Sequence, residues 1–305
     1  MRAIVFDDYG PPDVLQLREV AVPSPMADEI LIRIAAAAVN PADVKWRAGM
    51  FRDYAPIGFP HILGYDVAGT VESVGAGVTS FAPGDRVDAM LDPMSKGGYA
   101  EYVAIAADAA ARIPANLEFS TAAAIPCAGL TGVQIMEESI QLKPGETVLI
   151  TGATGAVGRL GVFAAGRLGG RVVAAVRASH AAEARALGAA EVVILGEEDW
   201  TGAPFDHVFD TVGGPAVARL CRHLAPGGRI RTAATTPIDP EGLSTMPLFV
   251  PVHQDGKRLR ELAEDVAAGR IPVPIARRMP LEAAVDAHQL LEAGGLGGKI
   301  ILEPR

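Results

Sequence analysis

The stretch Thr147–Gly158, TVLITGATGAVG, constrains the fold more than any other part of this chain. The apolar run Val148–Ile150 comes directly before three glycines, and a helical pattern follows them. This order predicts a strand, a tight turn and a helix. Such a turn directs the unpaired N–H groups and the positive dipole end of the helix toward one point, which suits a pyrophosphate.

The three glycines have separate tasks in such a turn. Gly152 allows the turn itself, Gly155 lets the backbone approach a phosphate, and Gly158 lets the helix lie close to the sheet. The spacing G-x-x-G-x-x-G is one residue away from the usual G-x-G-x-x-G, and a glycine pattern alone also fits an ordinary surface turn. The residues expected to bind the dinucleotide here are Gly152, Ala153, Thr154, Gly155, Ala156, Val157 and Gly158.

Apolar runs and helical segments alternate after the turn. The runs are Arg171–Val176, Glu191–Leu195, Phe205–Asp210 and Arg229–Thr232, and the helical segments are Ala181–Leu187 and Pro215–Leu224. Runs that are apolar throughout predict parallel strands whose sheet is covered on both faces, an α/β fold of the doubly wound kind. Ligands collect at the carboxyl ends of such strands, which places Val212 and Gly213 among the expected binding residues.

The end of the second strand distinguishes between the two nicotinamide dinucleotides. A chain that selects NAD usually places an Asp or Glu there, about 20 residues beyond the first glycines, to accept hydrogen bonds from the ribose 2′-OH. This chain has no carboxylate from Val176 to His180. A guanidinium and a hydroxyl suit a 2′-phosphate, so Arg177 and Ser179 favour NADP(H). The alternative is that Arg177 is simply a solvated residue at the end of a strand.

Composition limits the class of protein. With 305 residues the chain is longer than most single cores, which favours two domains. The net charge of −9 and the lack of a basic cluster argue against nucleic acid as a partner. Since no apolar stretch reaches the length of a membrane span and no signal peptide is evident, we expect a cytoplasmic protein without a membrane partner. Two cysteines, Cys127 and Cys221, indicate neither a disulfide framework nor a cysteine-based zinc site.

Residues 1–121 have a different residue pattern from the glycine-rich region. Many short strands with Gly/Pro turns predict a compact antiparallel barrel or sandwich. Its expected strands are Ala3–Phe6, Leu15–Val20, Glu29–Ala38, Asp66–Val74 and Arg86–Met90. In the tail we expect a helix over Lys257–Ala268, a strand over Arg270–Ile275, a helix over Leu281–Glu292 and a strand over Gly298–Leu302.

A series of short motifs suggests a family when the motifs are taken together in order. They are AVNPADVK at 38–45, GYDVAG at 64–69, GGYAEY at 97–102, GLTG at 129–132, the glycine turn, DTVGG at 210–214 and GKI at 298–300. Over essentially the whole chain they resemble the zinc-free quinone oxidoreductase branch of the medium-chain dehydrogenase/reductase superfamily. That branch also contains enone and alkenal reductases.

The resemblance implies two domains and the place of the active site. It implies a GroES-like antiparallel β-barrel domain over residues 1–121, completed by 268–305, and a Rossmann NADP(H)-binding domain over 122–267. It also implies an active site in the cleft between them and a homodimer. Thr131 resembles a family residue near the nicotinamide, although a helix-interior Thr can also bond back to a backbone carbonyl.

The residues themselves argue against a metal. Where zinc-dependent relatives have a Cys this chain has Asn40, and where they have Gly-His-Glu it has Gly64-Tyr65-Asp66. The six histidines show no ligand-like spacing. Without zinc, alcohol oxidation lacks its electrophile. Hydride transfer from NADPH to a quinone or an α,β-unsaturated carbonyl is easier, because hydrogen bonds and a proton donor can handle the resulting anion.

Four side chains are candidates for handling that anion. Asn40 offers its amide, Lys45 offers charge or a proton, and Asp43 would orient Lys45. The alternative for this segment is a helix start, with Asn40 as N-cap and Asp43 in the first turn. Tyr65 offers a hydroxyl, or is a packed residue whose O–H is satisfied locally.

Two other functions compete with a quinone or enone reductase. One is a zinc-type alcohol dehydrogenase relative, and the other is an NADPH-binding sensor without turnover. The glycine turn cannot separate a reductase from a sensor, because binding and catalysis use different residues.

Overall fold

The computed structural model describes every residue except 54, 96, 198 and 305. The chain forms two compact units, unit 1 from Met1–Cys127 with Gln254–Arg305 and unit 2 from Ala128–His253. These limits differ from the predicted ones at 121/122 and 267/268. The difference arises chiefly from helix α7 (Gly256–Ala267), which packs against β8 and β6 and therefore lies in unit 1.

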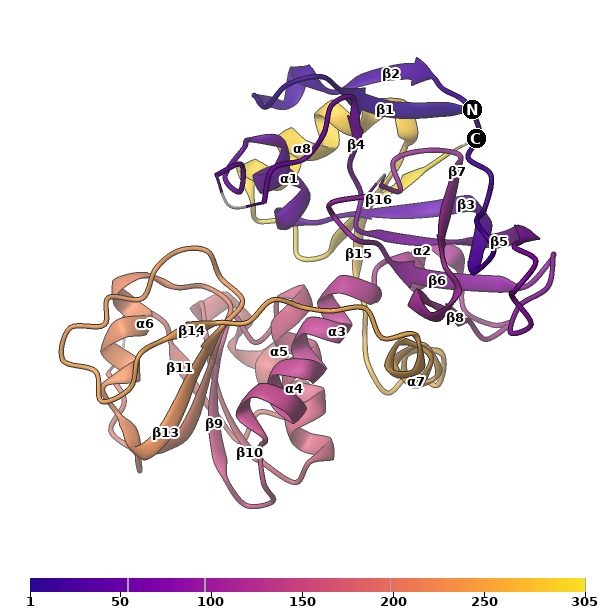
Figure 1. The fold of residues 1–305 in the computed structure, drawn as a ribbon. Coiled ribbons are helices and arrows are strands. Elements are labelled where there is room, and N and C mark those ends of the chain that lie inside the picture. The colour runs from indigo at the N-terminus through magenta and orange to yellow at the C-terminus, as the bar shows by residue number, and fades with distance from the viewer. Residues whose placement is uncertain (54, 96, 198, 305) are drawn as a thin grey trace. The chain divides into compact units, whose positions relative to one another are not determined.

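Unit 1 is built from two sheets (Figure 1). A three-stranded sheet has the order β2-β1-β4, and a seven-stranded sheet has the order β15-β16-β3-β5-β6-β8 with β7 also paired to β3. All pairs are antiparallel except β15 with β16. The strands are β1 (Arg2–Phe6), β2 (Gln16–Glu19), β3 (Glu29–Val39), β4 (His61–Ile62), β5 (Asp66–Val74), β6 (Arg86–Met90), β7 (Tyr102–Ala106), β8 (Ala110–Arg112), β15 (Ile275–Pro280) and β16 (Lys299–Glu303). The predicted antiparallel domain is confirmed.

The two faces of the large sheet differ. Because side chains alternate along a strand, Val67 and Val71 of β5 enter the main apolar core, whereas Asp66 points to the other face. On β6, Val87 and Ala89 enter that core and Asp88 does not. Helix α2 (Phe119–Ala123) packs on β3, β5 and β6. The remaining helices of this unit are α1 (Pro41–Arg47), α7 and α8 (Ala284–Ala293), and α3 (Pro126–Gln134) begins in it.

One predicted strand is wrong. Residues 270–275 form no strand apart from Ile275, and the strand β15 begins there instead. Pro272 and Pro274 lack the N–H that a strand pairing requires, so the chain joins the sheet only after the second proline.

Unit 2 contains one six-stranded sheet with the order β11-β10-β9-β12-β13-β14, and every pair is parallel. Figure 1 shows α4 and α5 on one side of this sheet and α6 on the other. The strands are β9 (Thr147–Thr151), β10 (Arg171–Val176), β11 (Glu191–Ile194), β12 (Phe205–Asp210), β13 (Leu224–Thr232) and β14 (Leu248–Phe249), and the helices are α4 (Ala156–Arg167), α5 (Ala181–Ala186) and α6 (Gly214–Cys221). The predicted parallel sheet is confirmed, and α6 ends earlier than expected because β13 already begins at Leu224.

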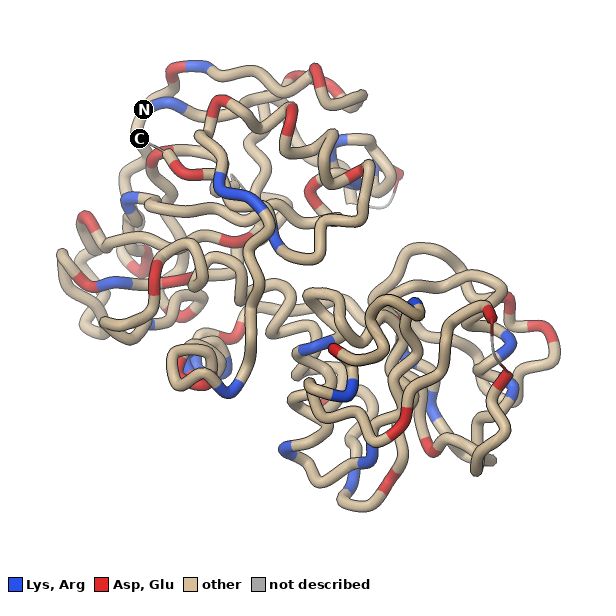
Figure 2. The backbone as a smooth tube through the Cα atoms, turned by 180° about the vertical axis from the view of Figure 1, so that it is seen from behind, with Lys and Arg blue, Asp and Glu red and all other residues tan. Residues whose placement is uncertain are grey.

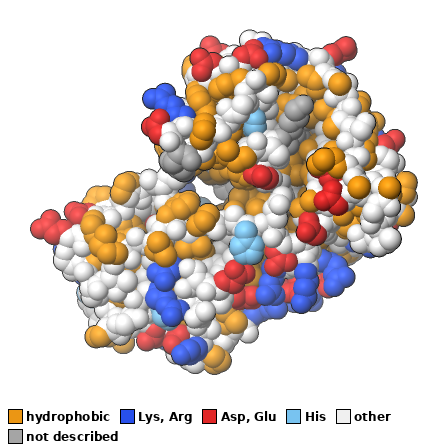
Figure 3. Space-filling model, in the orientation of Figure 1, with side chains coloured by type: hydrophobic (Ala, Val, Ile, Leu, Met, Phe, Trp, Pro, Cys, Tyr) orange, Lys and Arg blue, Asp and Glu red, His pale blue; other side chains and the backbone are white. Residues whose placement is uncertain are grey.

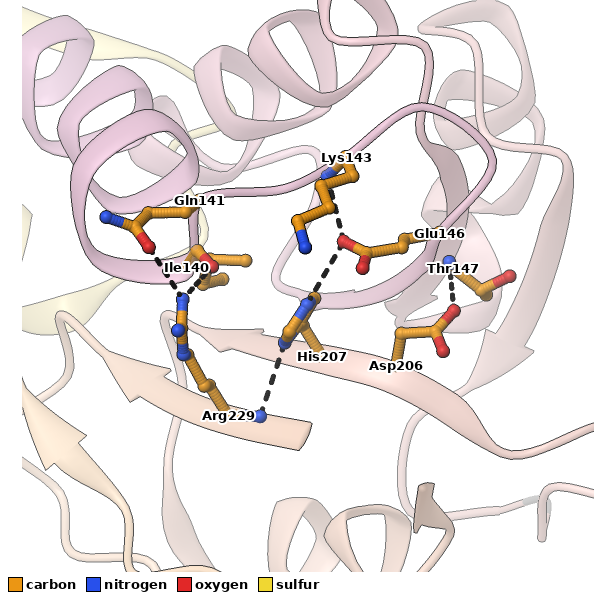
Figure 4. Close-up of polar contacts among 8 residues, drawn as sticks. All are labelled: Ile140, Gln141, Lys143, Glu146, Thr147, Asp206, His207 and Arg229. Carbon is orange, nitrogen blue, oxygen red and sulfur yellow. Dashed lines mark hydrogen bonds and ion pairs between the residues drawn. The ribbon is translucent and has the colours of Figure 1, made fainter. Parts of the chain in front are cut away.

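Side chains tie the starts of β9 and β12 to each other and to the middle of β13 (Figure 4). The backbone N–H of Arg229 donates to Nδ1 of His207 over 3.3 Å. The proton of the neutral ring therefore lies on Nε2, which is 3.3 Å from Oε2 of Glu146. Asp206 accepts the backbone N–H of Thr147 at 2.7 Å. These contacts join β9, β12 and β13 near the starts of β9 and β12.

Charges of both signs are spread along both units (Figure 2). In the space-filling view, positive and negative side chains alternate over α7 (Figure 3), where Arg258 pairs with Glu261 and Arg260 with Glu264. Within the described parts of the chain, no helix is both long and apolar enough to cross a membrane.

Candidate active site and dinucleotide site

The start of α1 brings Asn40 and Asp43 into the interior of unit 1. Asn40 is the N-cap and Pro41 the first helical residue, as the helix-start alternative predicts. The Asp43 carboxylate accepts the backbone N–H of Asn40 at 2.8 Å and that of Gly64 at 3.0 Å. Its side chain is fully buried, and burial raises the pKa of Asp43 to about 7. This carboxyl therefore fastens the helix start to the loop before β5.

The Asn40 side chain belongs to a buried polar cluster. Its Nδ2 donates to Oδ2 of Asp66 at 2.9 Å, and its Oδ1 accepts from Nζ of Lys299. The other oxygen of Asp66 accepts the backbone N–H of Cys127 at 2.8 Å. An amide has two N–H groups, and the second one of Asn40 has no partner among the described residues.

Tyr65 follows the loop and borders a small hollow that Trp46 also lines. Its hydroxyl oxygen accepts the indole N–H of Trp46, so its own O–H remains able to donate. Burial and the nearby Asp43 charge raise the pKa of Tyr65, which keeps the hydroxyl protonated. Asp43 and His61 line the same hollow, and burial lowers the pKa of His61.

Lys45 is not joined to this cluster by hydrogen bonds. Its ammonium group makes no hydrogen bond or ion pair in the described part of the chain, and Asp43 is occupied by two backbone N–H groups. Lys45 is partly buried, and burial lowers its pKa. The structure thus brings Asn40, Asp43 and Tyr65 together around the start of α1 but does not show Asp43 orienting Lys45.

Close packing around the glycine turn of unit 2 requires residues without a Cβ at two of its positions. Gly152 has φ +61°, and a Cβ there would lie 2.4 Å from Oγ1 of Thr211. A Cβ on Gly158 would lie 2.2 Å from the carbonyl oxygen of Gly152. No side chain caps α4, whose first N–H groups have no partner within the helix. A glycine-containing turn beside these free donors fits a pyrophosphate.

Asp210 organises the carboxyl ends of three strands, a role that the sequence did not reveal. It accepts the hydroxyl groups of Thr151 and Thr232, each at 2.6 Å. It also accepts the backbone N–H groups of Val212 and Gly213, each at 2.9 Å. The signal available in the sequence was a carboxylate that follows the apolar pair Val208-Phe209 at the end of the strand. Asp210 thereby fixes the loop that contains two of the predicted cofactor-binding residues.

Arg177 and Ser179 are exposed after β10, at the carboxyl edge of the sheet. Arg177 donates to Nε2 of His180 over 3.2 Å.

Arg159, which sequence reasoning treated only as part of a helix, is buried and binds both the carbonyl oxygen of Thr154 at 2.5 Å and Glu183 at 2.8 Å. It connects the glycine turn to α5. Thr131 is buried in α3.

A metal centre would need several close ligands. Among the residues that the structure describes, no group of three or more His, Cys, Asp or Glu side chains could hold a metal ion. At the position where zinc-dependent relatives have a Cys, the Asn40 amide is engaged by Asp66 and Lys299.

Comparison with known proteins places these features in one family. Residues 26–115 match the alcohol dehydrogenase GroES-like domain, and residues 187–302 match a family described as zinc-binding dehydrogenase. The chain is similar to 2-methylene-furan-3-one reductase of Solanum lycopersicum, with 34% identity over 100% of the chain and 79% of the relative. It is also similar to NADPH-dependent alkenal/one oxidoreductase, chloroplastic, of Arabidopsis thaliana, with 31% identity over 100% of the chain and 80% of the relative.

Solved structures agree with the sequence comparison. The quinone oxidoreductase of Escherichia coli complexed with NADPH superposes with a TM-score of 0.88 at 29% identity, and the match covers 100% of both chains. This confirms the predicted pairing of a GroES-like domain with a Rossmann domain. The chain belongs to the quinone oxidoreductase branch of the medium-chain dehydrogenase/reductase superfamily.

Proposed function

We propose that this protein is an NADPH-dependent reductase that transfers hydride to a quinone or an α,β-unsaturated carbonyl without a metal. The observation that carries the proposal is the Tyr65 hydroxyl, whose oxygen is anchored by Trp46 and whose proton is free beside a hollow. Hydride addition to a conjugated acceptor creates an oxyanion, and a fixed neutral donor is what stabilises such a charge. The names of the relatives above support the same substrate class.

The side chains of unit 1 have distinct roles in this proposal. Tyr65 and the unpaired amide N–H of Asn40 donate hydrogen bonds to the acceptor oxygen. Lys45 supplies positive charge or the proton, since burial lowers its pKa toward the working range. Asp43 holds the helix start in place and, with a pKa near 7, is present in both protonation states at neutral pH.

Unit 2 provides the residues that would hold NADPH, which supplies the hydride when bound. The turn from Gly152 to Gly158 receives the pyrophosphate, and Arg177 and Ser179 receive the 2′-phosphate. Thr131, Val212 and Gly213 complete the proposed set. NADPH complexes and NADPH dependence among the relatives support this cofactor.

The decisive experiment is a scan of NADPH oxidation, followed by its absorbance, against quinones, enones, alkenals, simple ketones and alcohols. We expect turnover with quinones or enones and no effect of a chelator. Tight NADPH binding without turnover across the panel would instead indicate a sensor. Alcohol oxidation together with stoichiometric zinc by elemental analysis would indicate an alcohol dehydrogenase.

A homodimer formed through β14 is part of the proposal. Strand β14 ends the order of its sheet, and its residues Leu248 and Phe249 are 54% and 50% exposed. An apolar strand with an open edge favours pairing with another strand, here β14 of a second copy. Light scattering should give a dimer for the wild type and a monomer for Leu248→Lys. The matched control Leu17→Lys, at an exposed leucine of unit 1, should stay dimeric. A monomeric wild type would contradict the dimer.

The cytoplasmic location stays a prediction, and cell fractionation tests it.

A further inference from the structure

We propose that Lys299 is a positioning residue that fixes the Asn40 amide in the orientation needed for catalysis. The proposal deepens the function proposed above and rests on it. Lys299 is the first residue of β16, which pairs with β3 through Ile300 opposite Val39. This pairing brings the lysine beside Asn40, which directly follows β3, although 259 residues separate the two in the sequence.

Three side chains close a ring of contacts. Lys299 donates from Nζ to Oδ1 of Asn40, Asn40 donates from Nδ2 to Oδ2 of Asp66, and Lys299 Nζ lies 3.6 Å from that same oxygen. A reversed amide would place its NH2 group against the ammonium and its oxygen against the carboxylate. Both contacts would then be repulsive, so the ring permits one amide orientation.

That orientation determines where the remaining donor points. The ring uses the amide oxygen and one N–H of Asn40, and the second N–H keeps a single direction. A preorganised donor stabilises a developing oxyanion better than one that must reorient during the reaction. Lys299 therefore acts on the acceptor through Asn40 and does not need to touch it.

The burial of the ring supports a positioning role over a purely stabilising one. Lys299 is 6% exposed and Asp66 is 0% exposed, so both charges have lost their hydration. Burial raises the pKa of Asp66, and the charge of Lys299 opposes this shift. A buried ion pair is often no more stabilising than apolar side chains of the same volume, whereas it can specify one arrangement. In this ring the specified arrangement is that of Asn40.

The test is a double-mutant cycle that combines Lys299→Met with Asn40→Ala. Each single variant should lower kcat by about 10²-fold, the usual effect of losing one oxyanion donor, and leave the Kd for NADPH within about twofold. In the Asn40→Ala background, Lys299→Met should cause no further loss, because its effect passes through Asn40. Lys299→Arg should recover part of the activity, and Lys257→Met, at an exposed lysine of unit 1, should behave as wild type.

Several results would overturn the proposal. One is that kcat is unchanged in Lys299→Met although it is reduced in Asn40→Ala. Another is that the fold loss of kcat in the double variant equals the product of the losses in the two single variants. A second readout needs no turnover: the side-chain amide resonances of Asn40 should shift in Lys299→Met and remain in Lys257→Met. If the wild type reduces no acceptor, the proposed function fails, while unchanged resonances would reject the role of Lys299. Should Lys299→Met not fold, Lys299→Arg and Lys299→Gln serve in the same cycle.

Discussion

The Arg47 guanidinium lies 3.3 Å from Nδ1 of His288 in the interior of unit 1. Arginine can only donate, so Nδ1 is unprotonated and the neutral ring carries its proton on Nε2, which is 3.3 Å from the Tyr99 hydroxyl. Arg47 also pairs with Glu292 at 2.5 Å. Burial and then the charge of Arg47 lower the pKa of His288 to about 3. The histidine is thus held neutral between a cation and a phenol.

This arrangement predicts a loss of stability in acid. Between pH 6.5 and about 3 the unfolded chain protonates His288 whereas the folded chain does not. The unfolded state therefore binds more protons, and stability decreases as the pH is lowered through this range. The slope from this one group is at most about 1.4 kcal/mol per pH unit. His288→Gln can keep both hydrogen bonds without titrating, and urea unfolding at several pH values should show a flatter acid limb. Gln289→Ala, at the exposed neighbour, should keep the wild-type limb, and an equally steep limb in His288→Gln would contradict the prediction.

Asp88 predicts the opposite pH dependence. Its side chain is fully buried, and neither carboxyl oxygen has a hydrogen-bond partner in the described structure. Burial, followed by the charge of Asp66, raises the pKa of Asp88 well above its usual value. Above about pH 4 the unfolded chain releases this proton and the folded chain retains it, so stability falls as the pH rises.

The substitution that checks this is Asp88→Asn. It should gain stability over wild type by up to about 1.4 kcal/mol per pH unit above pH 4 and match wild type near that pH. The control Asp28→Asn, at an exposed aspartate of the same unit, should show no such divergence. A constant difference between Asp88→Asn and wild type at all pH values would mean that Asp88 is already ionised in the folded protein.

Local pattern was sufficient for most of the fold. The strands Asp66–Val74, Arg86–Met90, Arg171–Val176 and Phe205–Asp210 have the predicted limits, because apolar runs bounded by Gly and Pro determine them. The predicted strand at Arg270–Ile275 failed because its two prolines outweigh its apolar residues. The two-residue strand β14 was missed because so short a segment has no periodicity.

The polar organisation of the site depends on contacts between distant parts of the chain. The sequence indicated Asn40 and Tyr65 but not their partners Lys299 and Trp46, since those contacts exist only after the strands have paired. Likewise, Asp210 appeared as part of a motif, and only the parallel sheet shows why a carboxylate is needed there. Residue types are visible in a sequence, whereas hydrogen-bond partners are set by topology.

Arg177→Asp should weaken NADPH much more than NADH. The variant replaces a cation by an anion at the end of β10, where the 2′-phosphate is expected to bind, while a 2′-OH can be accepted by a carboxylate. Titrations of cofactor fluorescence with both dinucleotides measure the change in preference. Arg185→Asp, which changes another exposed arginine of unit 2, should keep the wild-type preference. Unchanged discrimination in Arg177→Asp would remove the assignment of the 2′-phosphate site.

Lys45→Ala should lower turnover with little loss of cofactor affinity. The ammonium has no partner in the described structure, so its removal leaves no buried group unpaired and should cost little stability. If Lys45 supplies charge or a proton, kcat should fall by about 10²-fold, the lower end of the range for a general acid. Steady-state kinetics with NADPH and the best acceptor provide the measurement. Wild-type rates would return Lys45 to a structural role.

Tyr65→Phe should lower kcat by about 10²-fold and leave the Kd for NADPH unchanged, because it removes a donor to the developing oxyanion and nothing from the glycine turn. It also leaves the indole N–H of Trp46 without its acceptor, which should lower the free energy of unfolding by about 1–3 kcal/mol. Trp46→Phe separates the two effects, since it keeps the Tyr65 hydroxyl but removes its anchor. We expect a smaller loss of kcat in Trp46→Phe and none in the control Tyr102→Phe. Equal kcat in Tyr65→Phe and wild type, at temperatures where both are folded, would assign Tyr65 to packing alone.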